Sequence, residues 1–287
     1  MLRGGTRHMK TRWKPAIVTA LLIFSLSLSS SAQTASRDSH VHVKLISERT
    51  ALIPGKTTAV GLYFKLVPGW HIYWINAGDS GEPPRVLWTL PSGITAGDIQ
   101  WPTPQRITAD SLVSYGYTNS VLLTVPIAVR PTFTAREATL HADVNWLVCR
   151  EICIPGISKL DLKLPVSRTS RPTASSTLFR RARASLPKKL PIGWRATVSE
   201  AQEHFLLRVK TGRRLAKVSF IPRHSLQVSN DAEQKIRSMP NGITLTIRKS
   251  DELLSPIARL DGLLVLENGA SYDINAPVTS KNVAQKN

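Results

Sequence analysis

Short segments in which apolar and polar residues alternate recur along most of this 287-residue chain. In the segment HVHVKLIS, residues Val41, Val43 and Leu45 alternate with polar neighbours, and a period of two is typical of a half-buried strand. Similar runs cover 58–66, 70–75, 86–90, 121–129, 138–147 and 157–164. Turn-forming pairs such as Pro68-Gly69 and Pro155-Gly156 separate them. The pattern predicts an all-β fold with an antiparallel β-sandwich in this part of the chain.

A second strand-rich region follows a short break in the pattern. Residues 166–186 are interpreted as a polar linker and one short helix, which covers 177–186 and ends before Pro187. Further runs at 205–209, 216–221, 243–247, 257–266 and 271–274 predict a second, smaller β-sandwich over 187–277. The polar tail at 278–287 is expected to be disordered.

The first 32 residues have the three parts of a secretory signal peptide. Basic residues between Arg3 and Lys14 precede an apolar run of 13 residues, and small residues ending at Ala32 follow. The run is shorter than the roughly 20 residues that span a bilayer. The signal is complete whether translation starts at Met1 or at Met9. We therefore expect cleavage after Ala32 and export to an oxidising periplasm, as a soluble or peripherally bound protein.

The positive charge is concentrated in the C-terminal part of the chain. Of the formal net charge of +19, residues 166–287 carry an excess of 12. A basic exported region meets little nucleic acid, so a nucleic-acid partner is not expected. The charge is either a solvated surface or a face for peripheral contact with an anionic membrane or an acidic partner.

The two cysteines of the chain, Cys149 and Cys153, lie four positions apart in WLVCREICIPG. An oxidising compartment favours a disulfide between them. A ring of about five residues stabilises a fold by only about 2 kcal/mol, against about 4.7 kcal/mol for a loop of about 100 residues. A tight ring is also prone to distorted geometry, which makes a disulfide easier to reduce. Both points favour a redox-active pair.

Two other uses of the pair stay open at this stage. It can be a local structural staple in a non-catalytic binding module, or a dithiol that holds copper(I). The spacing does not show whether Arg150 or Glu151 faces the sulfurs, although the two charges shift a thiol pKa in opposite directions. Trp146, three residues before Cys149, is a candidate ring to shield the disulfide.

Two further motifs suggest other chemistry and are set aside. The segment Gly78 to Gly81, GDSG, is similar to the nucleophile segment of serine proteases, but no histidine and aspartate precede it in a matching context. It is expected to form a turn-rich loop. His40 and His42 share one strand face, but two imidazoles without a third ligand rarely hold an ion. No metal site and no cofactor are expected.

Four segments, in this order, carry a resemblance: GWHIYWINAGDSGEPP (69–84), WPTPQR (101–106), YGYTNSVLLTVPI (115–127) and WLVCREICIPG (146–156). Together they resemble the N-terminal periplasmic domain of the thiol-disulfide interchange protein DsbD and its copper-tolerance relatives of the ScsB type. The similarity covers 38–165. It implies two tandem immunoglobulin-like β-sandwiches, because the longer relatives carry an extra sandwich after the first.

The resemblance also implies a function, that of a protein-disulfide reductase or thiol-disulfide interchange component. Cys149 and Cys153 fall on the redox cysteines of the family, with Cys153 forming mixed disulfides and Cys149 resolving them. A cap loop matches about 111–119, where Tyr115 or Tyr117 would cover the pair. The implied partners are a membrane electron carrier on a separate chain and oxidised exported proteins that are thioredoxin-like or disulfide-isomerase-like.

Overall fold

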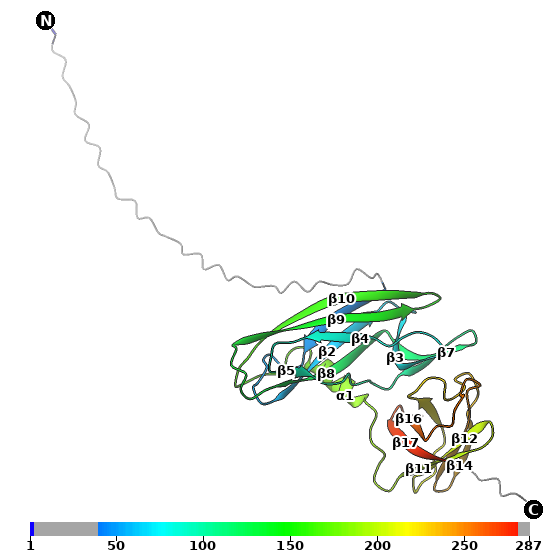
Figure 1. Ribbon diagram of the computed structural model, residues 1–287. Coiled ribbons are helices and arrows are strands. Elements are labelled where there is room, and N and C mark those ends of the chain that lie inside the picture. The colour runs from blue at the N-terminus through cyan, green and yellow to red at the C-terminus, as the bar shows by residue number, and fades with distance from the viewer. Residues whose placement is uncertain (3–39, 281–287) are drawn as a thin grey trace, which may run out of the picture. The chain divides into compact units, whose positions relative to one another are not determined.

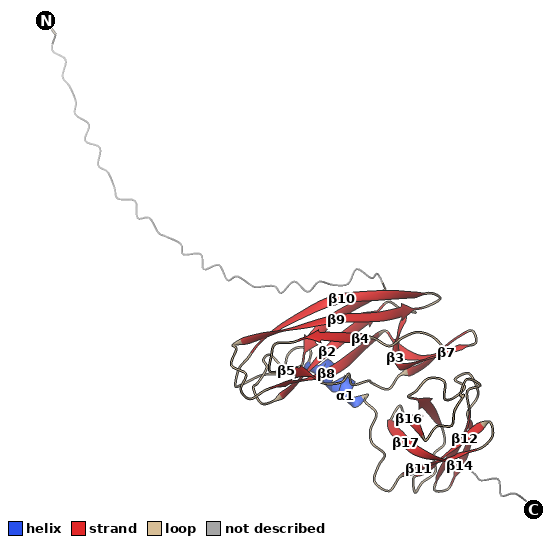
Figure 2. Ribbon diagram, viewed as in Figure 1, coloured by secondary structure: helices blue, strands red, loops and turns tan. Residues whose placement is uncertain are grey.

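The computed structural model describes residues 1–2 and 40–280 of the chain, so the predicted signal peptide lies almost entirely outside the described residues. Seventeen strands and one helix make up the regular structure of this part (Figure 2). The prediction of an all-β fold built from β-sandwiches is confirmed. In this part of the chain no helix combines the length and the apolar character that crossing a membrane requires.

The first sandwich consists of two antiparallel sheets (Figure 1). The first sheet has the order β1-β2-β8-β5. The second sheet has the order β10-β9-β3-β7-β6, with β4 paired to β9. The strands of the first sheet are β1 (Val41–Ser47), β2 (Thr57–Leu66), β5 (Ile94–Ala96) and β8 (Ser120–Val129). Those of the second are β3 (His71–Gly78), β4 (Arg85–Thr89), β6 (Gln105–Ala109), β7 (Leu112–Thr118), β9 (Glu137–Cys149) and β10 (Cys153–Pro165).

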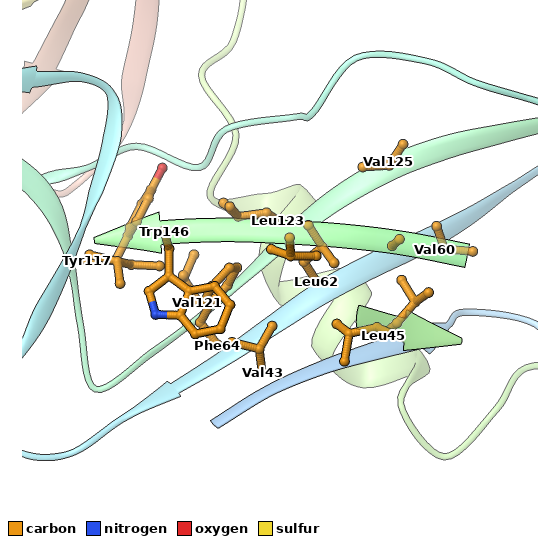
Figure 3. Close-up of a cluster of buried hydrophobic side chains, with 14 of the residues drawn as sticks. Val43, Leu45, Val60, Leu62, Phe64, Tyr117, Val121, Leu123, Val125 and Trp146 are labelled. Carbon is orange, nitrogen blue, oxygen red and sulfur yellow. The ribbon is translucent and has the colours of Figure 1, made fainter. Parts of the chain in front are cut away.

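Apolar side chains from both sheets meet in one core (Figure 3). Alternate positions of each strand point to opposite faces of its sheet, so the period of two in the sequence becomes one buried face per strand. Phe64 of β2 and Trp146 of β9 meet edge to face, with ring centroids 5.8 Å apart. Such aromatic pairs stabilise a core beyond the area that they bury.

The helix α1 (Ser176–Ala184) follows the first sandwich and packs against it. Its Phe179 is fully buried beside Leu122 of β8. Gly61 of β2 leaves room there, because an added Cβ atom would lie 3.3 Å from the Phe179 ring and closer still to Leu122. The predicted helix over 177–186 is therefore present, shifted by one or two residues.

The later strands form a single seven-stranded sheet with the order β13-β16-β17-β11-β12-β15-β14. All neighbours are antiparallel except β11 and β17, which are parallel. The strands are β11 (Arg195–Glu200), β12 (His204–Lys210), β13 (Val218–Pro222), β14 (Lys235–Met239), β15 (Gly242–Arg248), β16 (Arg259–Leu266) and β17 (Ser271–Ser280). This sheet encloses a second core that includes Phe205, Phe220 and Ile274.

Within the described residues, Ile221 and Leu263 of the later strands pack into the core of the first sandwich. The domain boundaries proposed from the sequence therefore stay predictions. Strand β17 extends to Ser280, three residues beyond the expected end of the second sandwich, and the rest of the tail lies outside the described residues.

Two local predictions are wrong. Pro155 and Gly156 do not form a turn, because β10 runs through both and pairs them with Leu147 and Trp146. Proline is tolerated since β10 is an edge strand of its sheet. The stretch 111–119, expected as a cap loop, is mainly the strand β7, which pairs with β3 and β6. The alternation also missed β5, β6, β11 and β14, which are short and partly exposed.

Candidate redox site

Cys149 and Cys153 form a disulfide where the β9–β10 hairpin turns. Cys149 is the last residue of β9, Cys153 is the first of β10, and the two are directly opposite in the register. Their Cα atoms are 4.2 Å apart. The turn between them is closed by a hydrogen bond that the Arg150 amide donates to the Ile152 carbonyl oxygen, at 3.1 Å. The register of two long strands therefore holds the pair in place.

The disulfide lies on the outer face of the second sheet, away from the main core. Trp146 and Val148 of β9 point into the core, so Cys149, one position further, points to the other face. There it packs with Tyr73, Ala77 and the partly buried Leu147. Cys149 is 2% exposed, whereas Cys153 is exposed. A partner molecule can thus reach the sulfur of Cys153 more easily than that of Cys149.

Tyr73 of β3 places its hydroxyl beside this exposed sulfur. The Oη atom of Tyr73 lies 3.5 Å from the Sγ atom of Cys153. A disulfide sulfur carries no proton, so the hydroxyl is the donor in the oxidised state. Burial raises the pKa of Tyr73, with hydrogen bonds to Ser80 and Ser114 acting weakly in the opposite direction. The phenol therefore stays protonated at neutral pH and is available to donate to a thiolate on Cys153.

The loop after β3 packs closely against the Tyr73 ring. Gly81 has a φ of +91°, and a Cβ atom on it would lie 2.1 Å from the Cζ atom of Tyr73. Only glycine permits both this backbone conformation and this close approach. Asp79 fixes the same loop, because its Oδ2 atom accepts a hydrogen bond from the amide of Val113 at 2.7 Å. The GDSG segment therefore positions the tyrosine, which explains its composition without any protease chemistry.

His71 is the second buried polar group next to the disulfide. It is the β3 partner of Cys149 across the sheet, and its ring meets that of Tyr73 edge-on at 5.1 Å. Burial lowers the pKa of His71, so the imidazole is neutral at neutral pH. Among the described residues its Nε2 atom has no hydrogen-bond partner.

The charges next to the cysteines largely offset each other. Arg150 and Glu151 form an ion pair with each other at 3.2 Å, and both side chains are exposed to solvent. Because the guanidinium is paired with the neighbouring carboxylate, each charge offsets the effect of the other on the sulfurs. Tyr73 and His71 thus define the local environment of the sulfurs more than the turn charges do.

The three rings expected to shield the disulfide lie elsewhere. Trp146 is on the core face of β9, where it contacts Phe64 (Figure 3). Tyr115 and Tyr117 of β7 are also part of the main core. The hydroxyl of Tyr115 donates to Oδ1 of Asn230 at 3.1 Å, and that of Tyr117 to the carbonyl oxygen of Pro102 at 2.7 Å.

Sequence reasoning missed His71, Tyr73 and Gly81 as site residues. A signal was present, because β3 is buried on both faces whereas most strands here are buried on one. The aromatic and imidazole residues at alternate positions of GWHIYWINAG mark a second covered face. As for metals, the described part of the chain contains no group of three histidine, cysteine or acidic side chains in metal-binding geometry. His40 stacks on the Trp70 ring at 3.8 Å.

Two comparisons relate this chain to known proteins. Residues 42–165 match the family model described as "Thiol:disulfide interchange protein DsbD, N-terminal". The chain is similar to the crystal structure of the N-terminal periplasmic domain of ScsB from Proteus mirabilis, with a TM-score of 0.63 and 15% identity. That match covers 84% of this chain and 94% of the ScsB domain, so the shared fold extends beyond the first sandwich into the later strands.

Other comparisons add little. SGBP-B of the Bacteroides ovatus mixed-linkage glucan utilization locus, solved in complex with a mixed-linkage heptasaccharide, is matched at 8% identity over 83% of this chain and 46% of its own. Its TM-score of 0.18 is too low to indicate a common fold. No curated protein matches the sequence. Residues 42–165, a little under half of the chain, thus match the family of the DsbD N-terminal domain, and they include the Cys149–Cys153 disulfide.

Proposed function

We propose that this chain is a periplasmic thiol-disulfide exchange protein that relays reducing equivalents from a membrane electron carrier to oxidised exported proteins. The observation that supports it most is the position of the Cys149–Cys153 disulfide on an outer sheet face, with Cys153 exposed and the Tyr73 hydroxyl 3.5 Å from its sulfur. A structural staple needs neither an accessible sulfur nor a buried proton donor beside it.

The proposed exchange takes place in two balanced steps. A thiolate of the reduced donor attacks Sγ of Cys153, the S–S bond breaks, and Cys149 leaves as a thiolate that takes up a proton. The second thiol of the donor then attacks the mixed disulfide, which oxidises the donor and releases Cys153 as a thiolate. Two electrons thus reach the cysteine pair. To reduce a substrate protein, the Cys153 thiolate attacks a disulfide of the substrate and forms a mixed disulfide. Cys149 then attacks Sγ of Cys153, which restores the Cys149–Cys153 disulfide and releases the reduced substrate.

The geometry supports different roles for the two cysteines. Cys153 is exposed and is the sulfur that a partner can reach, so it forms the mixed disulfides. Cys149 is buried next to Tyr73 and Ala77, directly opposite Cys153, and is therefore placed to resolve them from within the molecule. Tyr73 stabilises the Cys153 thiolate by donating a hydrogen bond to it.

Exposed apolar side chains near the disulfide offer a docking surface for a thioredoxin-like or disulfide-isomerase-like partner. Ile152 in the turn is 65% exposed and Ile157 of β10 is 70% exposed. Ile157 and Cys153 share the outer face of β10, because they are four positions apart. Apolar residues at this exposure around a reactive sulfur are typical of an interaction site.

Export and membrane contact are parts of the same proposal. The N-terminal pattern of a signal peptide and the periplasmic domain named in the ScsB match support a periplasmic location. The basic second sandwich would hold the protein near an anionic membrane, where the electron carrier lies.

Cysteine substitutions test the exchange function in cells. We expect Cys149→Ala to accumulate mixed disulfides through Cys153, visible as reducible adducts on non-reducing gels, because the resolving thiol is missing. Cys153→Ala should form no adducts, and Ser92→Ala, an exposed position in a distant turn, should behave as the parent chain.

A redox titration of the purified chain against glutathione gives an independent measure. We expect a reduction potential near about −200 mV, within the range of exchange proteins. A potential below about −300 mV together with the absence of adducts in the Cys149→Ala chain would show that the disulfide is structural and would contradict the proposal.

A further inference from the structure

One face of the second sandwich carries an unusual set of charges. The strands β11, β12, β15 and β14 lie side by side in this order. Their inward positions, which include Val198, Leu207 and Leu245, form the core of the second sandwich. The alternate positions therefore point outward. We call this outward surface of the four strands the cationic face.

Five basic side chains lie on the cationic face, and all are exposed to solvent: Arg195, Arg208, Lys210, Lys235 and Arg237. The strand register brings them together. Arg195 of β11 is directly opposite Lys210 of β12. Arg208 and Arg237 both lie opposite Thr244 of the strand between them, so they are two strand spacings apart, about 10 Å.

These charges are not neutralised within the molecule. Over residues 40–280, none of the five makes an ion pair or a side-chain hydrogen bond. The outward positions of the four strands contain no acidic residue. A sixth cation, Arg248, lies at the end of the face and is paired with Asp251 at 3.3 Å. The interior of the face is therefore uniformly positive.

The fold gains nothing from this arrangement. Like charges directly opposite on neighbouring strands, as in the Arg195 and Lys210 pair, destabilise a sheet. The spacing of about 10 Å between Arg208 and Arg237 is close to the Debye length at physiological ionic strength, so their repulsion is only partly screened. The positive potential of the face is consequently best explained by an anionic binding partner outside the chain.

We infer that the cationic face docks on a bilayer that contains anionic phospholipids. The side chains between the cations are mainly threonines, Thr197, Thr244 and Thr246. Leu206 and Met239 also lie on this face and are half-buried, and the face carries no tryptophan, tyrosine or phenylalanine. Protein interfaces depend on aromatic and exposed apolar anchors, whereas this face has no aromatic side chain and its outward Leu206 and Met239 are half-buried. Electrostatic attraction to a charged membrane surface needs several basic residues on an open face and no shaped pocket.

The inference rests on the part of the proposed function that brings the second sandwich to a membrane, and it specifies the surface. It can be tested without any redox measurement. The protein is used as residues 33–287, without the predicted signal peptide, because that segment is expected to be removed on export. The probes are vesicles of phosphatidylcholine with phosphatidylglycerol and vesicles of phosphatidylcholine alone, and the readout is co-sedimentation.

The test variant is the triple substitution Arg208→Ala, Lys210→Ala and Arg237→Ala. The control is Lys44→Ala, Lys65→Ala and Lys159→Ala, which removes the same charge from exposed positions of the first sandwich. The parent chain and the control should bind the anionic vesicles and should not bind the neutral vesicles. Because each basic residue near such a surface contributes about fivefold in affinity, the test variant should bind about a hundredfold more weakly.

A charge-conserving variant, Arg208→Lys, Lys210→Arg and Arg237→Lys, separates loss of charge from loss of folding and should bind like the parent. Equal binding to neutral and anionic vesicles, or an equal loss in test variant and control, would overturn the inference. So would binding of polyglutamate without binding of vesicles, which would assign the face to an acidic protein. The Cys153→Ala chain should still bind the anionic vesicles, which would show that membrane binding does not depend on the exchange function.

Discussion

Tyr73 is the side chain with the most direct control over the reactive sulfur. Its hydroxyl is 3.5 Å from Sγ of Cys153, and its ring is held by Gly81 on one side and by the ring of His71 on another. Burial keeps the phenol protonated, because it raises the Tyr73 pKa. A neutral donor fixed next to a sulfur favours the thiolate over the thiol when the disulfide opens.

Removal of this hydroxyl should make Cys153 a weaker nucleophile. In a Cys149→Ala background, Tyr73→Phe should raise the pKa of the Cys153 thiol and slow its alkylation by iodoacetamide about tenfold at neutral pH, since a hydrogen bond to a charged group is worth about 1.5–3 kcal/mol. The pH profile of alkylation measures both effects. Tyr63→Phe, a change of the same size on β2, is the control. An unchanged profile for Tyr73→Phe would remove the hydroxyl from the mechanism.

At the scale of elements, the β9–β10 hairpin is the part that holds the site. Thirteen residue pairs lie opposite each other between the two strands, ending in the Cys149 and Cys153 pair. Gly156 is essential to this pairing, because its missing side chain leaves space for the indole of Trp146 opposite. The hairpin can therefore carry a large core aromatic on one face and an accessible disulfide on the other.

Substitution at this glycine should disturb the hairpin. In Gly156→Ala the new Cβ atom would lie 2.2 Å from Cε2 of Trp146, so the indole has to move. Overpacking of this kind costs about 1–3 kcal/mol, and we expect that decrease in the free energy of unfolding together with a shift in tryptophan fluorescence. Lys159→Ala, at an exposed position of the same strand, should change stability by less than about 0.5 kcal/mol. Equal stability of the two variants would show that the ring is not confined.

At the scale of the whole molecule, the buried His71 and the partly exposed Asp273 give stability opposite dependences on pH. Burial lowers the pKa of His71 below its ordinary value of 6.5, so the unfolded chain binds the proton more tightly and acidification destabilises the fold. In the second sandwich, burial raises the pKa of Asp273, although Arg223 acts against it. The folded state binds that proton more tightly than the unfolded chain. The contribution of Asp273 to the free energy of unfolding therefore increases as pH falls through the range where carboxylates titrate.

The two effects occupy separate pH ranges, which makes the first one measurable. Between about pH 7.5 and 5.5 the free energy of unfolding should fall, because His71 contributes stability only above its unfolded pKa. His71→Gln should reduce this slope in urea unfolding experiments. His42→Gln, at an exposed position of β1, should keep the slope of the parent chain. A slope that persists unchanged in His71→Gln would assign the pH dependence to other groups.

Much of the fold follows from local pattern. The alternation of apolar residues predicted most of the long strands, because a strand with one buried face must repeat every two residues. It missed β6 and β14, which are short and largely exposed. It also predicted that β10 begins at Ile157, whereas the strand begins at Cys153. The dipeptide Pro155-Gly156 by itself predicts a turn. Only the structure shows that both residues pair with the neighbouring strand β9.

The amino-acid sequence by itself determined the all-β character of the protein, the cysteine pair and the excess of positive charge, because composition, spacing and periodicity are local properties. Only the tertiary structure decided what surrounds the sulfurs. Trp146 is three positions from Cys149 yet lies on the opposite face of the sheet, whereas Tyr73, 80 positions from Cys153, contacts its sulfur. The reason is physical: strand pairing sets the neighbours of a side chain, and pairing depends on segments that are distant in the sequence.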